Sequence, residues 1–194
     1  MIIGIDYGAK LAGTTAICFG ESPDSLNLIQ STKNVDADKF ILDILTEHNP
    51  LLIGLDAPLG LPPGVLGQGD NYFYRPCDTA LGAMSPMFIG GLTARAMKIK
   101  NDIQGLYHCE VIEVYPKAVT HKLLDENFKS LYKQKGQGTI ENFAVLLYEL
   151  HQIKTSNNPT NWHQLDAVLA WYSTYRYHIR QHLSFGDASG MIIV

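Results

Sequence analysis

The sequence is poor in cysteine, with three residues in a chain of 194: Cys18, Cys77 and Cys109. An odd number of widely separated cysteines fits neither a disulfide framework nor the paired spacing of a structural zinc site. No apolar run approaches the roughly 20 residues that a membrane-spanning helix requires. The first residues, Met1 to Asp6, also lack the basic segment of a secretory signal. We therefore expect a cytoplasmic protein with reduced cysteines and no membrane partner.

Charged residues are scarce as well, at 18% of the chain, and the formal net charge is −4. This charge argues against a dedicated nucleic-acid coat protein, whose affinity comes largely from neutralising phosphates. It is compatible with an enzyme that carries a small basic patch, because net charge does not describe how charge is distributed. Hydrophobic residues make up 46% of the sequence. We predict a single domain over residues 1–194 with a substantial core.

The hydrophobic pattern predicts strands that alternate with helices. Three strands come first, and the short segments between them favour an antiparallel meander. Pro50 ends the first helix and precedes a buried fourth strand that finishes at Asp56. The layout predicts an α/β protein with a mixed five-stranded sheet flanked by helices on both faces. The predicted strands are 2–6, 13–19, 25–31, 51–55 and 109–115, with 190–194 as a candidate edge strand, and the predicted helices are 35–48, 79–84, 91–103, 116–124, 139–154 and 161–182.

Two carboxylates directly follow buried strands. Asp6 ends the first strand, and Asp56 ends the fourth. An unpaired buried charge is very costly, so each carboxylate needs a hydrogen bond, a counter-charge or a metal ion. If the two strands are parallel neighbours, both acids lie at the carboxyl edge of the sheet, where open α/β sheets bind ligands. Two adjacent acids then require a cation or a shared proton.

Two further acids occupy unusual positions. Glu113 interrupts the apolar fifth strand, and Asp166 stands beside the apolar stripe of the last long helix. Ala167 and Ala170 are small neighbours that let this helix approach the sheet, so we expect Asp166 near the strand-end acids. Oxygen ligands of this kind suit Mg²⁺ or Mn²⁺ rather than zinc. Three or four carboxylates holding two such ions are the usual device for hydrolysing phosphodiester bonds.

Each acid also has a plainer explanation. The two strand-end acids are common turn formers that bond their own backbone. Glu113 could form an ion pair with Arg75 or Arg95, and Asp166 could complement the dipole of its helix's first turn. Four acids on converging elements nevertheless favour a shared site over four separate explanations.

Basic residues gather between the fourth and fifth strands, at Arg75, Arg95, Lys98 and Lys100. We interpret them as candidates for binding substrate phosphates, with the aromatic run 72–74 as a stacking surface for unpaired bases. A solvated helix face accounts equally well for the lysines.

His163 precedes Asp166 by three residues, on the same helix face. A histidine in this position could assist proton transfer at the site. A surface or capping histidine is the plainer explanation. No nucleophile elbow, phosphate-binding loop or Cys-x-x-Cys pair is present in the sequence.

Five segments together carry a family resemblance: Gly4-Ile5-Asp6, Leu55-Asp56-Ala57-Pro58-Leu59-Gly60-Leu61-Pro62, Arg75-Pro76-Cys77-Asp78, Glu113-Val114-Tyr115-Pro116 and Asp166-Ala167. They resemble the domain-of-unknown-function family numbered 429, whose members are predicted RNase H-like nucleases. The resemblance covers nearly the whole chain, and the Asp-Ala-Pro-Leu-Gly and Glu-Val-Tyr-Pro pieces are fairly specific. The opening Gly-Ile-Asp-Tyr-Gly-Ala-Lys also looks like that of predicted Holliday-junction resolvases, which share this fold.

The resemblance implies an RNase H-like sheet that carries the two strand-end acids and the acid of the last helix. Glu113 matches the family's glutamate before Tyr-Pro. Arg75 and Asp78 match its Arg-x-Cys-Asp segment, and we predict that both bind substrate. A shared fold does not by itself establish the chemistry.

We predict a metal-dependent nuclease that hydrolyses nucleic acid or a nucleotide substrate. Two alternatives stay open. A nucleotide-binding phosphotransfer protein could use the Asp-x-Gly turn that begins at Asp6, although sugar kinases of that superfamily need two such domains. A non-catalytic binding module could keep the fold, and the acidic pI is its best support. The predicted catalytic acids are Asp6, Asp56, Glu113 and Asp166, the predicted ligands of Mg²⁺ or Mn²⁺ are Asp6, Asp56 and Asp166, and the predicted substrate-binding residues are Arg75, Asp78, Arg95 and Lys98.

Overall fold

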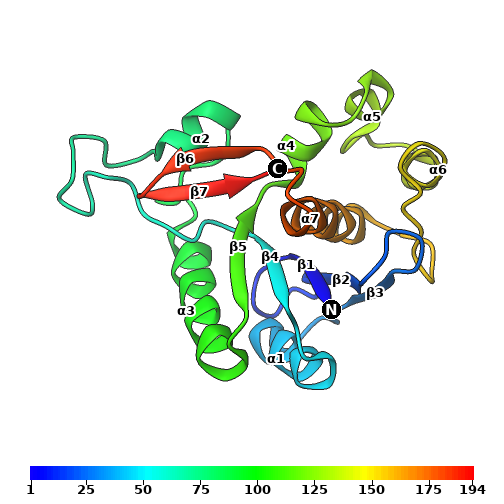
Figure 1. The fold of residues 1–194 in the computed structure, drawn as a ribbon, viewed down its shortest axis with the longest axis horizontal. Helices are drawn as coiled ribbons and strands as arrows, with labels where there is room; N and C mark the ends of the chain where they lie inside the picture. The colour runs from blue at the N-terminus through cyan, green and yellow to red at the C-terminus, as the bar shows by residue number, and fades with distance from the viewer.

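The computed structural model describes all 194 residues, and its seven strands form one mixed sheet in the order β3-β2-β1-β4-β5-β7-β6 (Figure 1). The predicted meander is present, since β1, β2 and β3 pair antiparallel. β4 pairs parallel with β1, and β5 pairs parallel with β4. The strands are β1 (Ile2–Asp6), β2 (Ala16–Gly20), β3 (Asn27–Gln30), β4 (Leu52–Asp56), β5 (Glu110–Val114), β6 (Ser184–Asp187) and β7 (Gly190–Ile193).

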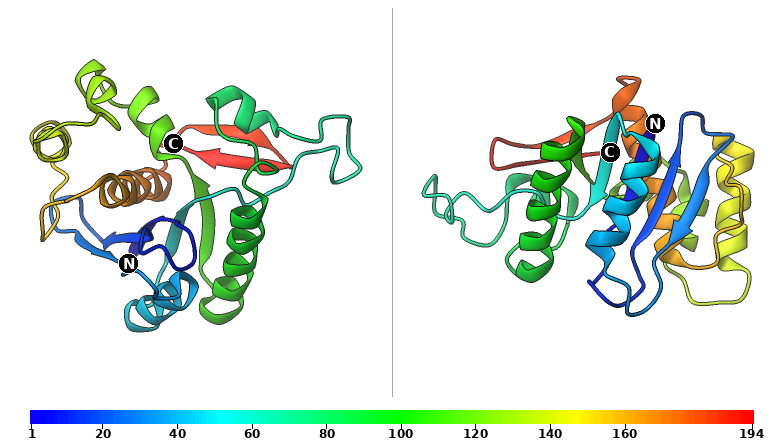
Figure 2. Two further views of the ribbon diagram at one scale, coloured as in Figure 1. Left: turned by 180° about the vertical axis from the view of Figure 1, so that it is seen from behind. Right: turned by 90° about the horizontal axis from the view of Figure 1, so that it is seen from below.

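Helices cover both faces of this sheet. α7 lies across one face with α4, α5 and α6 beyond it, and α1 and α3 lie against the other face (Figures 1 and 2). α2 packs near the hairpin formed by β6 and β7. The helices are α1 (Ala37–His48), α2 (Pro76–Leu81), α3 (Gly90–Tyr107), α4 (Pro116–Lys122), α5 (Glu126–Leu131), α6 (Thr139–His151) and α7 (Trp162–His178).

The central strands are apolar because both of their faces are covered. Ile3 and Ile5 of β1 pack with α1 and α3, whereas Ile2 packs with the core beneath α7. Full burial of one such side chain contributes about 1.5–3 kcal/mol. The two cores hold the sheet in a fixed position between the helical layers, so the ends of β1 and β4 are well-defined attachment points for functional side chains.

The predicted α/β fold, a mixed sheet flanked by helices on both faces, is confirmed, but the prediction of five strands is wrong. α7 ends at His178 rather than at residue 182, and Arg180 adopts a left-handed conformation with φ 59° directly afterwards. The chain then forms the hairpin of β6 and β7. β6 was missed because its Ser184–Asp187 segment is largely exposed and lacks an apolar alternation. The segment 190–194 is a strand as predicted, although β6 rather than β7 forms the edge of the sheet.

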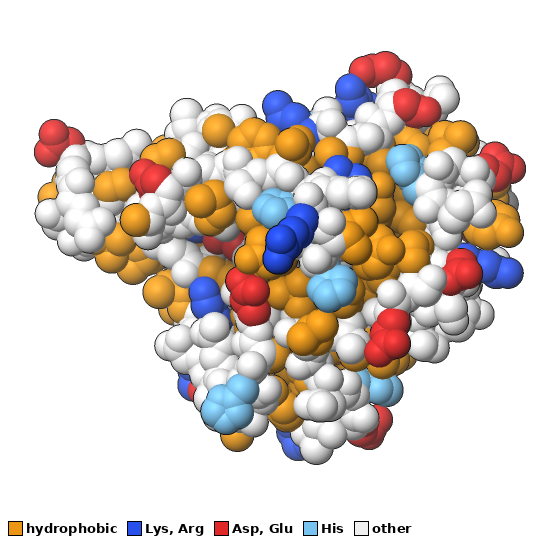
Figure 3. All heavy atoms as spheres, in the orientation of Figure 1, with side chains coloured by type: hydrophobic (Ala, Val, Ile, Leu, Met, Phe, Trp, Pro, Cys, Tyr) orange, Lys and Arg blue, Asp and Glu red, His pale blue; other side chains and the backbone are white.

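The segment between β4 and α2 projects from the body of the protein (Figure 1). Residues 65–73 within it are exposed, as expected for a Gly- and Pro-rich connection. None of the seven helices combines the length and apolar character that crossing a membrane would demand. On the face shown in Figure 3, side chains of both charge signs are dispersed and form no broad patch of one sign.

Candidate carboxylate site

The two strand-end acids are direct neighbours. β1 and β4 run parallel, and their register pairs Asp6 with Asp56 across the ladder. The same register pairs Gly4 with Gly54 two residues earlier. Because side chains alternate between faces along a strand, the acids and the glycines point to the same face of the sheet. That face is the one that α7 covers.

The glycine pair lets α7 approach the sheet closely enough to bring its own acid to the site. A Cβ atom at Gly4 would lie 2.0 Å from the backbone nitrogen of Trp171, and one at Gly54 would lie 1.8 Å from Thr174 Oγ1. Only glycine therefore fits at these two positions without a shift of the helix or of its side chains. The predicted close approach of this helix is confirmed, and Asp166 lies on its first turns.

A cavity of about 500 Å³ brings the three acids together; we call it the carboxylate cavity. Asp6, Asp56 and Asp166 all line it. The rest of its lining is mostly basic or aromatic, so the acids lie within a rim of positive charge. The other lining residues are Tyr115, Lys117, His121, Lys129, Tyr132, Lys133 and His163.

Two of the three acids have partners within the protein. His163 Nδ1 lies 2.7 Å from Asp6 Oδ2. The Tyr132 hydroxyl donates to Asp166 Oδ1 at 2.8 Å, and the Lys133 ammonium donates to Asp166 Oδ2. The Asp56 carboxylate has neither a hydrogen bond nor an ion pair to another side chain.

The lack of a partner for Asp56 affects its protonation. Burial, followed by the charges of Asp6 and Asp166, raises the pKa of Asp56 well above its ordinary value. Burial likewise raises the pKa of Asp166 to about 6, although Lys133 opposes the rise. The hydrogen bond to Asp6 raises the pKa of His163. Asp56 therefore lies beside two further acids without a bonded counter-charge of its own, a condition that a bound cation would relieve.

The chemistry of these donors fits Mg²⁺ or Mn²⁺, which prefer carboxylate oxygens. The arrangement does not form a finished metal site, since no three His, Cys, Asp or Glu side chains stand close enough around one point to hold an ion. Asp166 is engaged by Lys133 and Tyr132 instead. Asp6 and Asp56, neighbours in register, are the pair that best fits a first ion.

Glu113 lies apart from this group, in a buried ion network. Arg75 Nη1 and Nη2 donate to its two carboxylate oxygens at 2.7 and 2.6 Å, and the Leu59 backbone N–H donates to Oε2 at 2.7 Å. Arg75 also donates to both oxygens of Asp78, and only 1% of the Arg75 side chain is exposed. Of the two explanations for Glu113 given above, the structure shows the ion pair with Arg75. This network anchors the segment after β4 beside the sheet.

The other predicted substrate-binding residues lie outside the carboxylate cavity and have partners of their own. Arg95 donates to Asp38 at 2.7 Å and to the Gly8 carbonyl at 3.2 Å. Lys98 forms an exposed ion pair with Asp102, one helical turn along α3. Neither residue lines the cavity that holds the three acids.

Several residues of the site were missed by sequence reasoning. Lys117 follows the end of β5 by three residues, so the rule that ligands bind at strand ends could have found it. Tyr132 and Lys133 follow α5, a short helix that the hydrophobic pattern did not predict. No local signal in the sequence links them to Asp166, because their contact spans more than thirty residues of chain.

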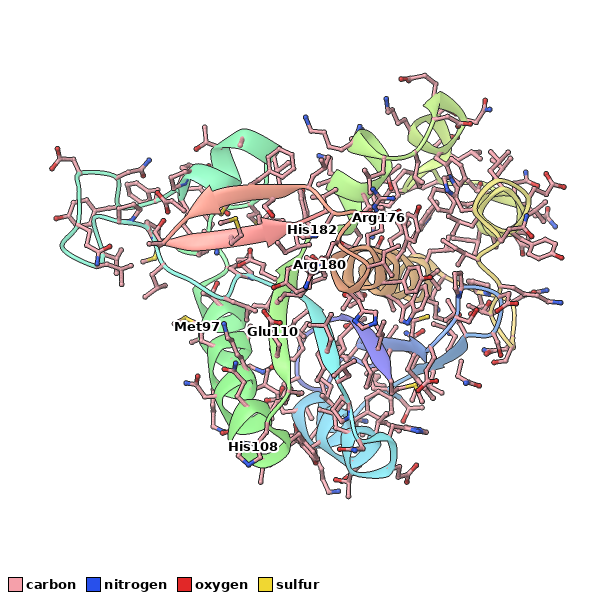
Figure 4. All side chains as sticks on the ribbon, in the orientation of Figure 1. Met97, His108, Glu110, Arg176, Arg180 and His182 are labelled. Atoms are coloured by element: carbon pink, nitrogen blue, oxygen red, sulfur yellow. The ribbon has the colours of Figure 1, made fainter.

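A second group of polar residues lies at the opposite end of β5. Tyr177 donates to Glu110 at 2.9 Å, and Arg180 and His182 line a cavity with them. Glu110, Arg180 and His182 are labelled in Figure 4 and come from β5 and from the segment after α7. This group contains one carboxylate, and it sits at the amino end of the parallel strands, so it is the weaker candidate for a metal site.

Comparisons with known proteins find similar structures but no protein of similar sequence. No protein-family model matches the chain, and no curated protein matches it in sequence. A structure of RuvC from Thermus thermophilus in complex with a Holliday junction substrate covers 93% of this chain and 96% of its own, with a TM-score of 0.45 and 13% identity. Another Thermus thermophilus RuvC structure covers 92% of this chain and 95% of its own, with a TM-score of 0.44 and 12% identity. Similarity at this level assigns no role to any residue.

Proposed function

We propose that this protein is a metal-dependent nuclease that hydrolyses phosphodiester bonds of nucleic acid at the carboxylate cavity. One observation carries the proposal: Asp6 and Asp56 are neighbours in register at the carboxyl ends of β1 and β4, and Asp166 faces the same cavity. The resemblance to the family numbered 429 supports the same activity.

The acids would hold Mg²⁺ or Mn²⁺. Asp6 and Asp56 would be the ion's first ligands, and Asp166, which is paired with Lys133 here, would be a third. When bound, the metal supplies an activated water and stabilises the negative charge that develops on the phosphate. Tyr132 keeps Asp166 oriented toward the cavity through its hydrogen bond.

The basic rim of the cavity would bind the phosphates of the substrate. Lys117, Lys129 and His121 line the cavity together with the acids. Contacts of lysine to phosphate oxygens position a nucleic-acid strand and contribute affinity that depends on salt. This local patch explains how a chain of net charge −4 could bind a polyanion.

His163 is the candidate for handling a proton at the site. Its Nδ1 is engaged by Asp6, which leaves Nε2 as the ring nitrogen that can exchange a proton with solvent or substrate. The side chain is 43% exposed, so a proton can leave it readily. The geometry thus supports an assisting role for this histidine, which the sequence offered as the less plain of two explanations.

Two observations favour a second candidate, a non-catalytic binding module. Lys133 already neutralises Asp166, and no three ligands converge on one point. A protein that binds nucleic acid with its lysines, and keeps Asp6 and Asp166 paired internally, would show the same arrangement. The two candidates differ in whether the cavity binds a divalent cation.

Calorimetry with Mn²⁺ separates these candidates. The wild type should bind Mn²⁺, and Asp6→Asn and Asp56→Asn should each weaken binding at least tenfold. Asp70→Asn is the matched control, because Asp70 is an exposed acid in the projecting segment. Cleavage of branched, single-stranded and hybrid oligonucleotides would then be screened with the same four proteins. Absence of Mn²⁺ binding to the wild type, with and without oligonucleotide, would exclude the nuclease and leave the binding module.

A further inference from the structure

A second cavity, of about 220 Å³, adjoins the carboxylate cavity; we call it the apolar cavity. The two cavities share Asp6, Asp56 and Tyr115 in their linings. They therefore open on either side of the same pair of strand-end acids. A molecule bound at these acids can extend into both.

The walls of the apolar cavity are mainly hydrophobic. Ala57 and Pro58 come from the segment after β4, Ile89 and Leu92 come from the start of α3, and Met84 lies between α2 and α3. Met84 is 60% exposed and stands at the surface. These side chains offer van der Waals contact and no charge.

Apart from the strand-end acids that it shares with the carboxylate cavity, the charged residues of the apolar cavity are already paired. Arg75, Asp78 and Glu113 line it, but their charged groups bond to one another and are buried. Burial of unpaired charge is costly, so this network does not readily release a partner to a ligand. The cavity therefore suits an uncharged and largely apolar group, and the phosphate part of a ligand belongs on the basic rim of the neighbouring cavity.

The size of the apolar cavity limits what can enter it. Its volume is about 220 Å³, less than half that of the carboxylate cavity. This is the scale of one purine or pyrimidine ring, and a base pair does not fit. A base that stays paired within a duplex cannot reach the cavity, whereas an unpaired or displaced base can.

We propose that the apolar cavity binds one unpaired nucleobase of the strand whose phosphate lies at the carboxylate cavity. This inference rests on the proposed function and specifies its substrate class: nucleic acid with unpaired nucleotides at the point of cleavage. Bases next to the bound one meet an exposed aromatic surface, where the rings of Phe73 and Phe88 lie 5.8 Å apart. These side chains are 54% and 63% exposed, which leaves their faces available for stacking.

An abasic substitution tests the inference directly. Binding is measured by fluorescence anisotropy in Ca²⁺, with a short labelled single strand, the same strand with one central abasic site, and the strand in a perfect duplex. The strands are kept short so that each can bind in only one position, and the protein concentration is kept low. The difference in affinity then reflects the missing base. The intact strand should bind roughly tenfold more tightly than the abasic strand, and more tightly than the duplex.

Filling the cavity should remove the preference for the intact strand. Leu92→Trp places a large side chain in the space, and Ile89→Trp is a second filling variant should the first not fold. Each should bind intact and abasic strands equally. Val145→Trp is the matched control, because Val145 is an exposed apolar residue on α6 and lies outside both cavities. Retained Mn²⁺ binding shows that a filling variant has kept its strand-end acids in place.

The outcomes separate this inference from the proposed function. Equal binding of intact and abasic strands by the wild type overturns the nucleobase site and leaves the nuclease proposal standing. A wild-type preference that persists in a folded filling variant also overturns the nucleobase site. Failure of the metal-loaded wild type to bind any of the three nucleic acids overturns the proposed function and the nucleobase site together.

Discussion

His163 Nδ1 lies 2.7 Å from Asp6 Oδ2, so a histidine of α7 is bonded to the acid that ends β1. This bond, which favours the charged imidazolium, raises the pKa of His163 above its ordinary value of 6.5. NMR titration of the metal-free protein should show a His163 midpoint above 6.5, and Asp6→Asn should lower that midpoint. His151, at the end of α6, is the control. Burial lowers its pKa, and Asp6 is not among the groups that shift it.

The same bond has a consequence for stability. A histidine whose pKa is higher in the folded state stabilises that state fully below pH 6.5, and this contribution is lost as the pH rises through the folded-state pKa. Asp6→Asn should therefore reduce the free energy of unfolding more at pH 5.5 than at pH 8. An equal reduction at both pH values would show that the bond is absent in solution.

Lys133 takes the place of a cation beside Asp166, and its removal should have opposite effects on stability and on metal binding. In the metal-free protein, Lys133→Met should lower the free energy of unfolding by about 1 kcal/mol, a modest value because the Lys133 side chain is 45% exposed. It should also raise the affinity for Mn²⁺ several-fold, since Asp166 then becomes available as a ligand. Thermal unfolding in a chelator and calorimetry measure the two effects.

Lys135→Met provides the matched control, because Lys135 is exposed and makes no ion pair. Its stability and Mn²⁺ affinity should both equal those of the wild type. A Lys133→Met protein that binds Mn²⁺ less tightly than the wild type would mean that the lysine supports the metal site and does not compete with it.

The buried network around Arg75 should matter more for folding than any exposed ion pair. Arg75→Met leaves the carboxylates of Glu113 and Asp78 buried without a counter-charge. Loss of one partner from such a network costs about 3–5 kcal/mol. Lys98→Met breaks an exposed pair on α3 and should change stability by less than about 1 kcal/mol. Urea unfolding compares the two variants, and similar losses in both would contradict the structural role of the network.

The sequence predicts the fold wherever burial leaves an apolar pattern. Strand β1 was predicted with its observed bounds, Ile2–Asp6, because both faces of the strand are covered. β6 has one partner strand and largely exposed residues, so its pattern carries no such signal. The apolar residues Ile179 and Leu183 extend the stripe of α7 past its true end, which made the predicted helix too long.

The site was predictable where it depends on strand ends and unpredictable where it depends on distant contacts. Asp6 and Asp56 were placed together by the rule that parallel strands share a carboxyl edge, and the register confirms this placement. The ion pair of Lys133 with Asp166 joins two segments through tertiary packing alone. Local sequence patterns carry no information on such a contact, so neither segment by itself predicts that Lys133 and Asp166 form an ion pair.

Asp166 should make the metal-free protein less stable as the pH rises. Its pKa is raised from 3.8 to about 6 by burial, so the folded state holds the proton more tightly than the unfolded state does. The protonated Asp166 carboxyl therefore stabilises the folded state at low pH, and this stabilisation is lost as the pH rises from about 4 to about 6. A pKa difference of this size corresponds to about 3 kcal/mol.

Asp166→Asn tests this pH dependence. Relative to the wild type, the variant should gain on the order of 3 kcal/mol of unfolding free energy on going from pH 4 to pH 7, measured by urea unfolding in a chelator. Asp70→Asn should show the wild-type dependence. If Asp166→Asn and the wild type change in parallel across this range, the carboxyl is not protonated near pH 6 in the folded protein.

At Gly4 the sheet meets the backbone of α7 directly, and this position should tolerate no larger residue. A Cβ atom there would lie 2.0 Å from the Trp171 backbone nitrogen and 2.7 Å from the Ala167 carbonyl oxygen. Backbone atoms of a packed helix cannot move separately, so Gly4→Ala must displace α7 as a whole. Insertion of extra atoms into a packed core costs about 1–3 kcal/mol, and more where the backbone must shift.

Gly54 offers a comparison at the register partner of Gly4. A Cβ atom there would lie 1.8 Å from Thr174 Oγ1, a side-chain atom that can rotate away at the expense of its hydrogen bond to the Ala170 carbonyl. Gly54→Ala should therefore reduce stability less than Gly4→Ala, and the double variant Gly54→Ala, Thr174→Ala should recover part of the loss. Because α7 also carries Asp166, Gly4→Ala should weaken Mn²⁺ binding in any fraction that still folds. Equal stability of Gly4→Ala and the wild type would mean that α7 stands farther from β1, and Asp166 farther from Asp6, than the structure places them.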